Sequence, residues 1–226
     1  MSYPTLLEPA EVASHFVKVL AASELIEQPY RRWKLIDVFP ESMCTGILTL
    51  PIPPPVVTID TKGQRATFND QRTFFTPRLR EFYPAVSVLC DAMQRPEVAR
   101  QFQSTCGIKA KKGYLRMEYI QDLDGAWLEP HCDIPEKLFS MVLYLCTGPY
   151  ARDWGTDIYD SNRKPIGRSP ADFNTAAIFI AGPNTWHGFD PRPIHGVRRL
   201  MEINYVSDDW RDRDQLAFPD RPIKLN

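Results

Sequence analysis

Residues 138–147 read LFSMVLYLCT, and this stretch alternates between two kinds of side chain. The odd positions from 139 to 145 are Phe, Met, Leu and Leu, whereas the even positions from 140 to 146 are Ser, Val, Tyr and Cys. Successive side chains of a β-strand point to opposite faces, so one face of this strand is apolar and the other is semi-polar. We expect the apolar face to pack under helices and the semi-polar face to line a cavity.

Further short strands are predicted on both sides of this stretch. They cover 114–120, 127–133, 156–159, 175–181, 185–189 and 197–207, and Gly, Pro, Asn and Asp separate them. Short strands at this spacing are typical of a double-sheet barrel of the jelly-roll or cupin kind. The predicted fold class is therefore mainly β (α+β).

The N-terminal half supplies the helices that would cover such a barrel. Helical spacing of apolar residues predicts a helix over 9–26, and two more follow over 79–93, interrupted near Pro84, and 96–102, ended by Gly107. Residues 33–50 are expected to be extended. We expect one domain over 1–226, with helical support and edge strands in 1–112, the catalytic core in 113–207 and a C-terminal tail in 208–226.

Composition narrows the classes of function and partner. The chain has 226 residues, 43% of them hydrophobic, and a net charge of -1, with no long basic run that would neutralise nucleic-acid phosphates. Its five cysteines form no CxxC motif, which favours reduced thiols. No signal-peptide pattern or 20-residue apolar run is present. We expect a cytoplasmic protein that binds neither nucleic acid nor membrane; the sequence leaves its oligomeric state open.

Two histidines and one aspartate are the candidate metal ligands. His131 and Asp133 are two residues apart on a predicted strand and therefore point to one side, and His187 follows on a later strand. Two imidazoles and one carboxylate can occupy one face of an octahedral iron and leave the opposite positions for a cosubstrate and O2. Cys132 points the other way and is expected to be a packed core thiol. A hydrogen-bonded His131–Asp133 pair with His187 in the core is the alternative.

The order His-x-Asp, distal His and then Arg resembles the Fe(II)- and 2-oxoglutarate-dependent oxygenases. The resemblance runs from about 114 to 207 and includes Leu143-Tyr144-Leu145 and Trp154-Gly155-Thr156. It implies a double-stranded β-helix with Fe(II), 2-oxoglutarate and O2 as cofactor and cosubstrates. It also implies conversion of 2-oxoglutarate to succinate and CO2, coupled to hydroxylation of a substrate. A small-molecule metabolite is the expected substrate, because 226 residues leave little beyond the barrel to hold a macromolecule.

The resemblance also implies residues for the cosubstrate. Arg198 would pair with the distal carboxylate of 2-oxoglutarate, and Tyr144, or less directly Tyr119, would donate a hydroxyl to it. Strand parity favours Arg198 over Arg199, because Arg198 shares its face with the more polar residues of 197–206. Leu200 stands where the family often has Ser or Thr, so one hydrogen bond is missing or comes from elsewhere.

Other polar and aromatic residues have weaker claims to a role. Arg116, Asn204 and Trp154 are candidate substrate contacts, although each is also explained by pairing with a neighbour or by core packing. His15 is expected to interact with Glu11 on a helix surface, and His195 to lie in a solvent loop. Two alternative functions remain: a cupin-like iron or zinc enzyme that does not use 2-oxoglutarate, and a catalytically silent barrel that binds a ligand or a protein.

Overall fold

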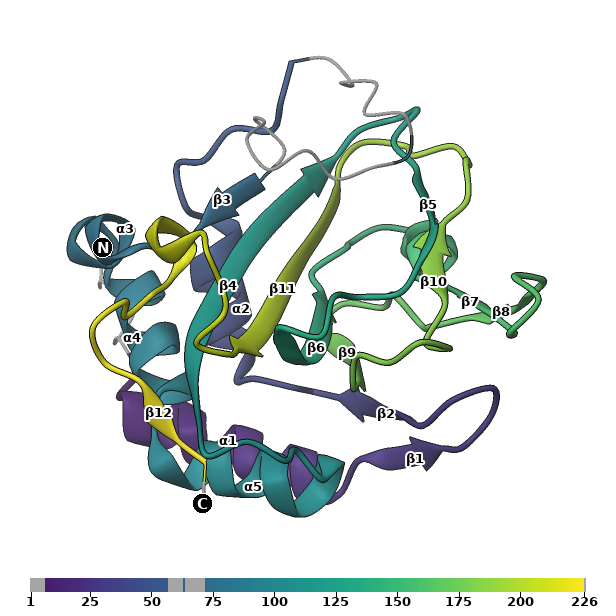
Figure 1. The fold of residues 1–226 in the computed structure, drawn as a ribbon. Coiled ribbons are helices and arrows are strands. Elements are labelled where there is room, and N and C mark those ends of the chain that lie inside the picture. Colours follow the sequence, from purple (N-terminus) through teal and green to yellow (C-terminus); the bar gives the residue numbers. More distant parts are fainter. Residues whose placement is uncertain (1–6, 57–62, 64–71, 226) are drawn as a thin grey trace.

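The computed structural model describes residues 7–56, 63 and 72–225. Its strands are β1 Glu24–Ile26, β2 Arg32–Ile36, β3 Arg72–Phe74, β4 Lys112–Asp122, β5 Leu128–His131, β6 Lys137–Tyr144, β7 Asp157–Tyr159, β8 Pro165–Arg168, β9 Thr175–Phe179, β10 His187–Phe189, β11 Arg198–Val206 and β12 Ile223–Lys224. They form two antiparallel sheets (Figure 1). The larger has the order β1-β2-β9-β6-β11-β4-β12, with β3 also paired to β4, and the smaller has the order β5-β10-β7-β8.

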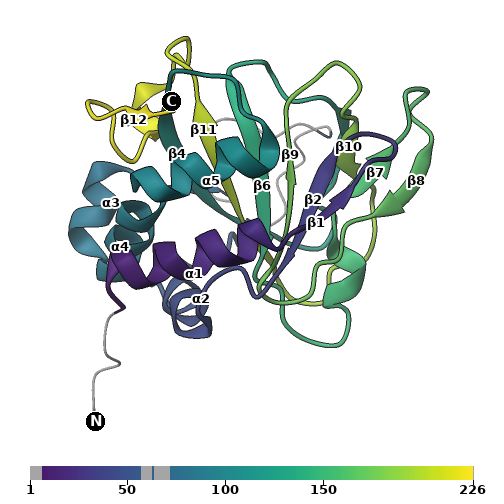
Figure 2. The ribbon, with the colours of Figure 1, turned by 90° about the horizontal axis from the view of Figure 1, so that it is seen from below.

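The described residues of the N-terminal half form five α-helices: α1 Pro9–Ala21, α2 Glu41–Leu48, α3 Pro77–Phe82, α4 Pro84–Met93 and α5 Pro96–Cys106. Figure 2 shows α1 and α5 lying across the larger sheet. The predicted fold class, a mainly β double-sheet barrel supported by N-terminal helices, is confirmed. None of the described helices is long and apolar enough to cross a membrane.

The alternating apolar side chains of residues 138–147 determine which face of the larger sheet packs against the helices. Phe139, Met141 and Leu143 of β6 are buried in the main core. Phe102 of α5 stacks on Phe139 with 4.1 Å between ring centroids, and Phe16 of α1 packs on Phe102 at 5.4 Å. Aromatic pairs at such distances add to the stabilisation from burial alone. The opposite face of β6 is thereby left to the barrel interior.

Several predicted helix boundaries were wrong. The first helix ends at Ala21 rather than 26, because residues 24–26 pair with β2 as an edge strand. Part of 33–50 is extended as predicted, but 41–48 form α2, which buries Met43, Cys44 and Ile47 at helical spacing. The helix predicted over 79–93 begins two residues earlier and is interrupted before Pro84, as expected, which gives α3 and α4. The last helix continues to Cys106 rather than 102, and Gly107 ends it as predicted, with a left-handed φ of 73°.

Residues 208–225, predicted as a tail, return to the barrel. β12 pairs with β4, and Leu216 forms an isolated bridge with Arg116. His15 also differs from expectation: its Nε2 lies 2.7 Å from the carbonyl oxygen of Asp37 rather than pairing with Glu11. That contact ties α1 to the turn after β2.

Candidate functional site

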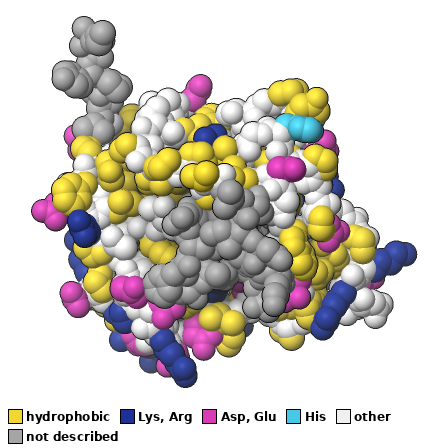
Figure 3. Space-filling model, turned by 90° about the horizontal axis from the view of Figure 1, so that it is seen from above, with side chains coloured by type: hydrophobic (Ala, Val, Ile, Leu, Met, Phe, Trp, Pro, Cys, Tyr) yellow, Lys and Arg dark blue, Asp and Glu magenta, His cyan; other side chains and the backbone are white. Residues whose placement is uncertain are grey.

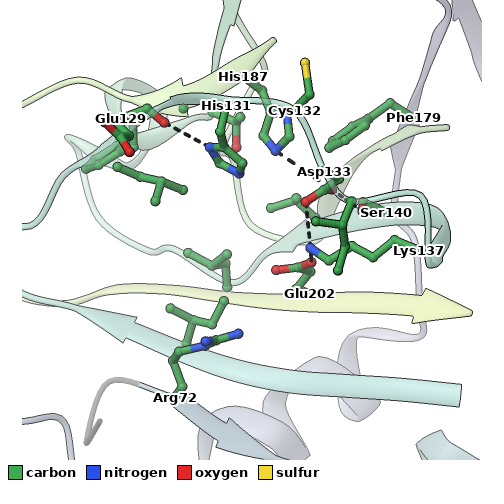
Figure 4. Close-up of a pocket in the computed structure, with 18 of the residues that line it drawn as sticks. Arg72, Glu129, His131, Cys132, Asp133, Lys137, Ser140, Phe179, His187 and Glu202 are labelled. Atoms are coloured by element: carbon green, nitrogen blue, oxygen red, sulfur yellow. Dashed lines mark hydrogen bonds and ion pairs between the residues drawn. The ribbon is translucent and has the colours of Figure 1, made fainter. Parts of the chain in front are cut away.

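The structure brings His131, Asp133 and His187 together at the mouth of the barrel (Figure 4). His131 ends β5, and His187 begins β10 directly opposite it in the register. One ligand atom from each of the three residues lies within 4.8 Å of the others, and Asp133 Oδ2 is 4.0 Å from His187 Nε2. Among the described residues, this is the group of His, Cys, Asp or Glu side chains that could hold a metal ion.

Backbone carbonyls orient both imidazoles. Nδ1 of His131 lies 2.9 Å from the carbonyl oxygen of Glu129, and Nδ1 of His187 lies 2.9 Å from that of Thr185. A carbonyl oxygen only accepts, so each Nδ1 carries the proton and each Nε2 lone pair is free to bind a metal. Burial lowers the pKa of His187 to about 4, so this ring is neutral at pH 7.

Asp133 is held at both carboxylate oxygens. Ser140 Oγ donates to Oδ2 at 2.5 Å, and Lys137 Nζ donates to Oδ1 at 2.7 Å. Burial is the largest influence and works to raise the pKa of Asp133, but Lys137, through its charge and its hydrogen bond, and His187 together outweigh it and lower that pKa. Asp133 lies beyond the end of β5, so a loop rather than strand alternation brings it beside the histidines. Two neutral imidazoles and an ionised carboxylate fit Fe(II) chemically.

The group opens into a cavity of about 360 Å³ between the two sheets. Arg198 lies at one end and is 1% exposed, while Leu200 and Glu202 follow it on the same face of β11. The Arg198 guanidinium lies 4.0 Å above the Phe189 ring. Its Nε donates to the carbonyl oxygen of Trp154 at 2.7 Å, and its Nη1 contacts Asp122 on β4. Arg198 is thus fixed in one orientation.

Arg199 points to the other side of the sheet. It is half-buried, and its Nε lies 3.4 Å from Gln121 Oε1. Its neighbours on that face, Met201 and Ile203, belong to the helix-packed core. The predicted assignment of the cavity side to Arg198 agrees with this geometry.

Three hydroxyl groups cluster beside the Arg198 end of the cavity. Tyr144 Oη donates to Thr156 Oγ1 at 2.6 Å and lies 2.6 Å from Ser169 Oγ. Because the phenol has one proton, and this bond uses it, the Thr156 hydroxyl keeps its own proton to donate, and Thr156 lines the cavity. Thr156 and Ser169 were not among the predicted site residues. They supply hydroxyl groups near Leu200, the position at which the family often has Ser or Thr.

Close backbone contact builds this cluster. Ser169 N donates to the Thr156 carbonyl oxygen at 2.9 Å, next to Gly155. A Cβ at Gly155 would lie 1.8 Å from the Ser169 carbonyl oxygen. Only glycine therefore allows the two segments to approach, which gives the glycine of Trp154-Gly155-Thr156 a packing reason.

A network of charged side chains forms the other end of the cavity. Arg116 Nη1 donates to Asn204 Oδ1 at 2.8 Å and to Glu118 Oε1 at 3.1 Å, and Arg72 pairs with Glu118 at 2.6 Å. Lys137 contacts Glu202, which lies 3.9 Å from Arg116. Arg116 thus lines this end, whereas Asn204 is 0% exposed and is not among the lining residues, and both belong to a buried network.

Trp210 adds a wall that the sequence did not predict, and the buried Gln215 binds the Arg116 side chain. The Arg116 guanidinium lies between the rings of Phe74, at 5.0 Å, and Trp210, at 4.9 Å, and its Nε donates to Gln215 at 2.9 Å. Cation–π contacts of this kind hold a guanidinium in place. The C-terminal segment therefore completes the cavity.

Of the remaining predicted residues, Tyr119, Trp154 and His195 lie away from the cavity, whereas Cys132 lines it. Tyr119 is on the helix-packed face of β4, where burial raises its pKa to about 12, so it does not reach the Arg198 end. Trp154 is 2% exposed in a separate apolar cluster, and it meets the site only through its carbonyl oxygen. Cys132, expected in the core, is partly exposed, because β5 has already ended and its alternation no longer applies. His195 is exposed in a loop, as predicted.

No known family model matches the sequence, and no curated protein matches it. Solved structures match the fold. A Phytophthora capsici prolyl 4-hydroxylase has a TM-score of 0.59 at 14% identity, over 92% of this chain and 68% of that chain. A Trichoplax adhaerens prolyl hydroxylase, solved with a hypoxia inducible factor peptide fragment, has 0.57 at 11% identity, over 86% and 88%. A 2OG-Fe(II) oxygenase family oxidoreductase from Burkholderia pseudomallei has 0.55 at 14% identity, over 91% and 94%.

The chain therefore has the fold of the Fe(II)- and 2-oxoglutarate-dependent oxygenases, the double-stranded β-helix, as the sequence predicted. It also carries a candidate facial triad, His131, Asp133 and His187, in that fold.

Proposed function

We propose that the chain is an Fe(II)- and 2-oxoglutarate-dependent oxygenase that hydroxylates a small molecule. One observation carries the proposal: the His-Asp-His group and a buried arginine line the same cavity. A metal ligand set that leaves coordination positions open and a guanidinium that can bind a carboxylate are the two components that a metal-bound oxo-acid requires.

His131, Asp133 and His187 would hold Fe(II). The bound metal would activate O2 and couple decarboxylation of 2-oxoglutarate to oxidation of the substrate. Arg198 would bind the distal carboxylate of 2-oxoglutarate, already oriented by Asp122 and by the Trp154 carbonyl. Donors that are fixed before the ligand arrives lose little conformational freedom when it binds.

The hydroxyl cluster gives Arg198 a partner. Thr156 would donate to the same carboxylate, with Tyr144 and Ser169 holding its oxygen in place. Tyr144 would then act through Thr156.

Apolar side chains line the cavity between its two polar ends. Ile120, Val142 and Leu200 come from three neighbouring strands, and each is at most 9% exposed. A dry, apolar surround strengthens the electrostatic contacts of a bound anion and keeps water from reactive species.

The size and polarity of the cavity favour a small polar substrate. About 360 Å³ lies at the low end of the range for small-molecule sites. On the face shown in Figure 3, acidic and basic side chains of the described residues are interspersed, an arrangement that does not favour a polyanion. The charged network around Arg116 and Glu202 would contact the polar groups of the substrate.

The test is succinate formation from 2-oxoglutarate under O2, with Fe(II) and ascorbate added to protein purified without oxygen. We expect succinate from the unmodified chain and none above background from His131→Ala, Asp133→Ala or His187→Ala. His195→Ala, which removes an exposed loop histidine, is the matched control and should retain activity. A triad variant with full activity would remove that residue from the metal site.

Two other results would replace the proposal with an alternative function. Metal binding without succinate would favour a cupin-like enzyme that does not use 2-oxoglutarate, and neither would favour a ligand-binding barrel. The substrate is then sought by thermal shift with 2-oxoglutarate present, since a bound ligand stabilises the folded state.

A further inference from the structure

We propose that Lys137 keeps a fourth protein ligand, Glu202, away from the metal, so that the coordination positions opposite the His-Asp-His face stay open. The proposal rests on the metal site of the proposed function. Lys137 would contact neither the metal nor the cosubstrate, and it would act by binding the carboxylates of Asp133 and Glu202.

Lys137 bridges the two carboxylates. It is the first residue of β6, four positions after Asp133, and its side chain is 14% exposed. Its Nζ donates to Asp133 Oδ1 at 2.7 Å and also to Glu202 Oε1. Figure 4 shows this ammonium between the carboxylates of Asp133 and Glu202, on the side of Asp133 away from the histidines.

Glu202 is close enough to become a ligand if it is released. Two oxygens that share one ammonium are no more than roughly 6 Å apart. Two adjacent ligands of one ion lie roughly 3 Å apart, given metal–oxygen bonds of about 2.1 Å. That bound applies to Glu202 Oε1 and Asp133 Oδ1, which share Lys137 Nζ, and rotation about the three χ angles of a released Glu202 would let its carboxylate move by the difference.

The charge of Glu202 also suits a divalent cation. Its carboxylate faces the cavity, where the charged groups around it are Lys137, Arg116 and Glu118. Burial works to raise the pKa of Glu202, but Lys137 and then Arg116 outweigh it and hold that pKa well below its usual range. An ionised carboxylate that has lost its ammonium partner attracts a nearby divalent cation.

The number of open coordination positions on the metal decides whether it can bind both 2-oxoglutarate and O2. Three protein ligands on an octahedral metal leave three positions, which a bidentate 2-oxo acid and O2 would fill. A fourth protein ligand would leave two, and either the cosubstrate or O2 would be excluded. Because Lys137 holds Glu202, the carboxylate of Asp133 would be the one that binds the metal, although two carboxylates lie nearby.

The experiment uses Co(II), which binds without O2 chemistry and whose visible absorption reports the number and kind of its ligands. The full chain is titrated as the unmodified protein, Lys137→Met, Lys137→Arg and the double variant Lys137→Met/Glu202→Gln. The matched control is Lys112→Met. Lys112 Nζ also lies 2.7 Å from an aspartate oxygen, that of Asp208, but at the surface.

We expect Lys137→Met to bind Co(II) more tightly, on the order of ten-fold or more, with a changed visible spectrum. The double variant should return to the affinity and spectrum of the unmodified chain, because the added ligand is gone. Lys137→Arg should keep the original spectrum, since a guanidinium can still hold both carboxylates. Lys112→Met should change nothing.

Weaker or unchanged Co(II) binding by Lys137→Met would overturn the proposal and leave Lys137 a role only in orienting Asp133. Tightening that persists in the double variant would also overturn it, because Glu202 would not be the added ligand. Circular dichroism checks the fold of each variant, and Lys137→Gln, for which a smaller tightening is expected, replaces Lys137→Met if the latter does not fold. Co(II) binding with no succinate formation would refute the proposed function and leave this inference standing.

Discussion

Replacing each of the two adjacent arginines separates the cosubstrate anchor from its neighbour. Arg198 is buried at the cavity end, whereas Arg199 lies on the helix-facing side with Gln121 as its contact. We expect Arg198→Ala to raise the 2-oxoglutarate concentration needed for half-maximal succinate formation much more than Arg199→Ala does.

The structure limits the size of this effect. Loss of a buried charge-assisted contact costs about 2 to 5 kcal/mol. Asp122 already neutralises part of the Arg198 charge, so we expect the lower part of that range, about 2 to 3 kcal/mol, or roughly 30- to 150-fold in concentration. Arg199→Ala should change the requirement by a few-fold at most.

The assay measures initial rates of succinate formation against 2-oxoglutarate concentration. Arg198→Ala removes the buried Arg198–Asp122 ion pair, which is expected to destabilise the fold. The double variant Asp122→Asn/Arg198→Ala also removes the Asp122 charge and should show the same rise in the requirement on a more stable fold. A larger rise for Arg199→Ala than for Arg198→Ala would refute the assignment of cavity and helix faces on β11.

Three further predictions concern the hydroxyl cluster and the buried histidine. Tyr144→Phe should raise the 2-oxoglutarate requirement several-fold with little change in thermal stability, since Thr156 Oγ1 loses the donor that orients it; an unchanged requirement in the succinate assay would remove Tyr144 from this role. Gly155→Ala should abolish 2-oxoglutarate binding in a thermal-shift titration, because its Cβ displaces the Ser169 backbone; normal binding would contradict the close approach. In metal-free protein the pKa of His187 is about 4 in the folded state and 6.5 in the unfolded state, so between these pH values only the unfolded state takes up a proton. The free energy of unfolding should therefore be highest above pH 6.5 and should fall by up to about 3 kcal/mol as the pH decreases to about 4. Urea unfolding should show this slope in the unmodified chain and a flatter one in His187→Gln, and equal slopes would count against the lowered pKa.

Strand alternation predicted much of the barrel, because a period of two residues is a local property of the sequence. It identified the core face of β6 and the cavity side of Arg198. The same rule, applied to β4, would have corrected another expectation. Arg116 and Tyr119 are three residues apart and cannot both face the cavity, and Arg116 is the one that does.

Features that depend on distant segments were not predictable in this way. Thr156 and Ser169 meet because β7 pairs with β8, and the four residues of β8 are all exposed and too few to show a strand pattern. Lys137 and Glu202 meet across two strands whose register the sequence does not state. Helix α2 was read as extended because the stretch 33–50 contains both a strand and a helix, each shorter than the window that reveals its period.

The C-terminal segment around Trp210 allows the substrate cavity to vary separately from the metal site. Trp210 lines the cavity beside Arg116, Gln215 accepts a hydrogen bond from Arg116, and both belong to a segment that contributes none of the candidate metal ligands. Mutations there can alter which molecule enters while the oxidising centre stays intact. A lineage carrying this scaffold can therefore acquire new substrates by exchanging about ten residues after β11, and the same short stretch is the natural target for directed evolution of its selectivity.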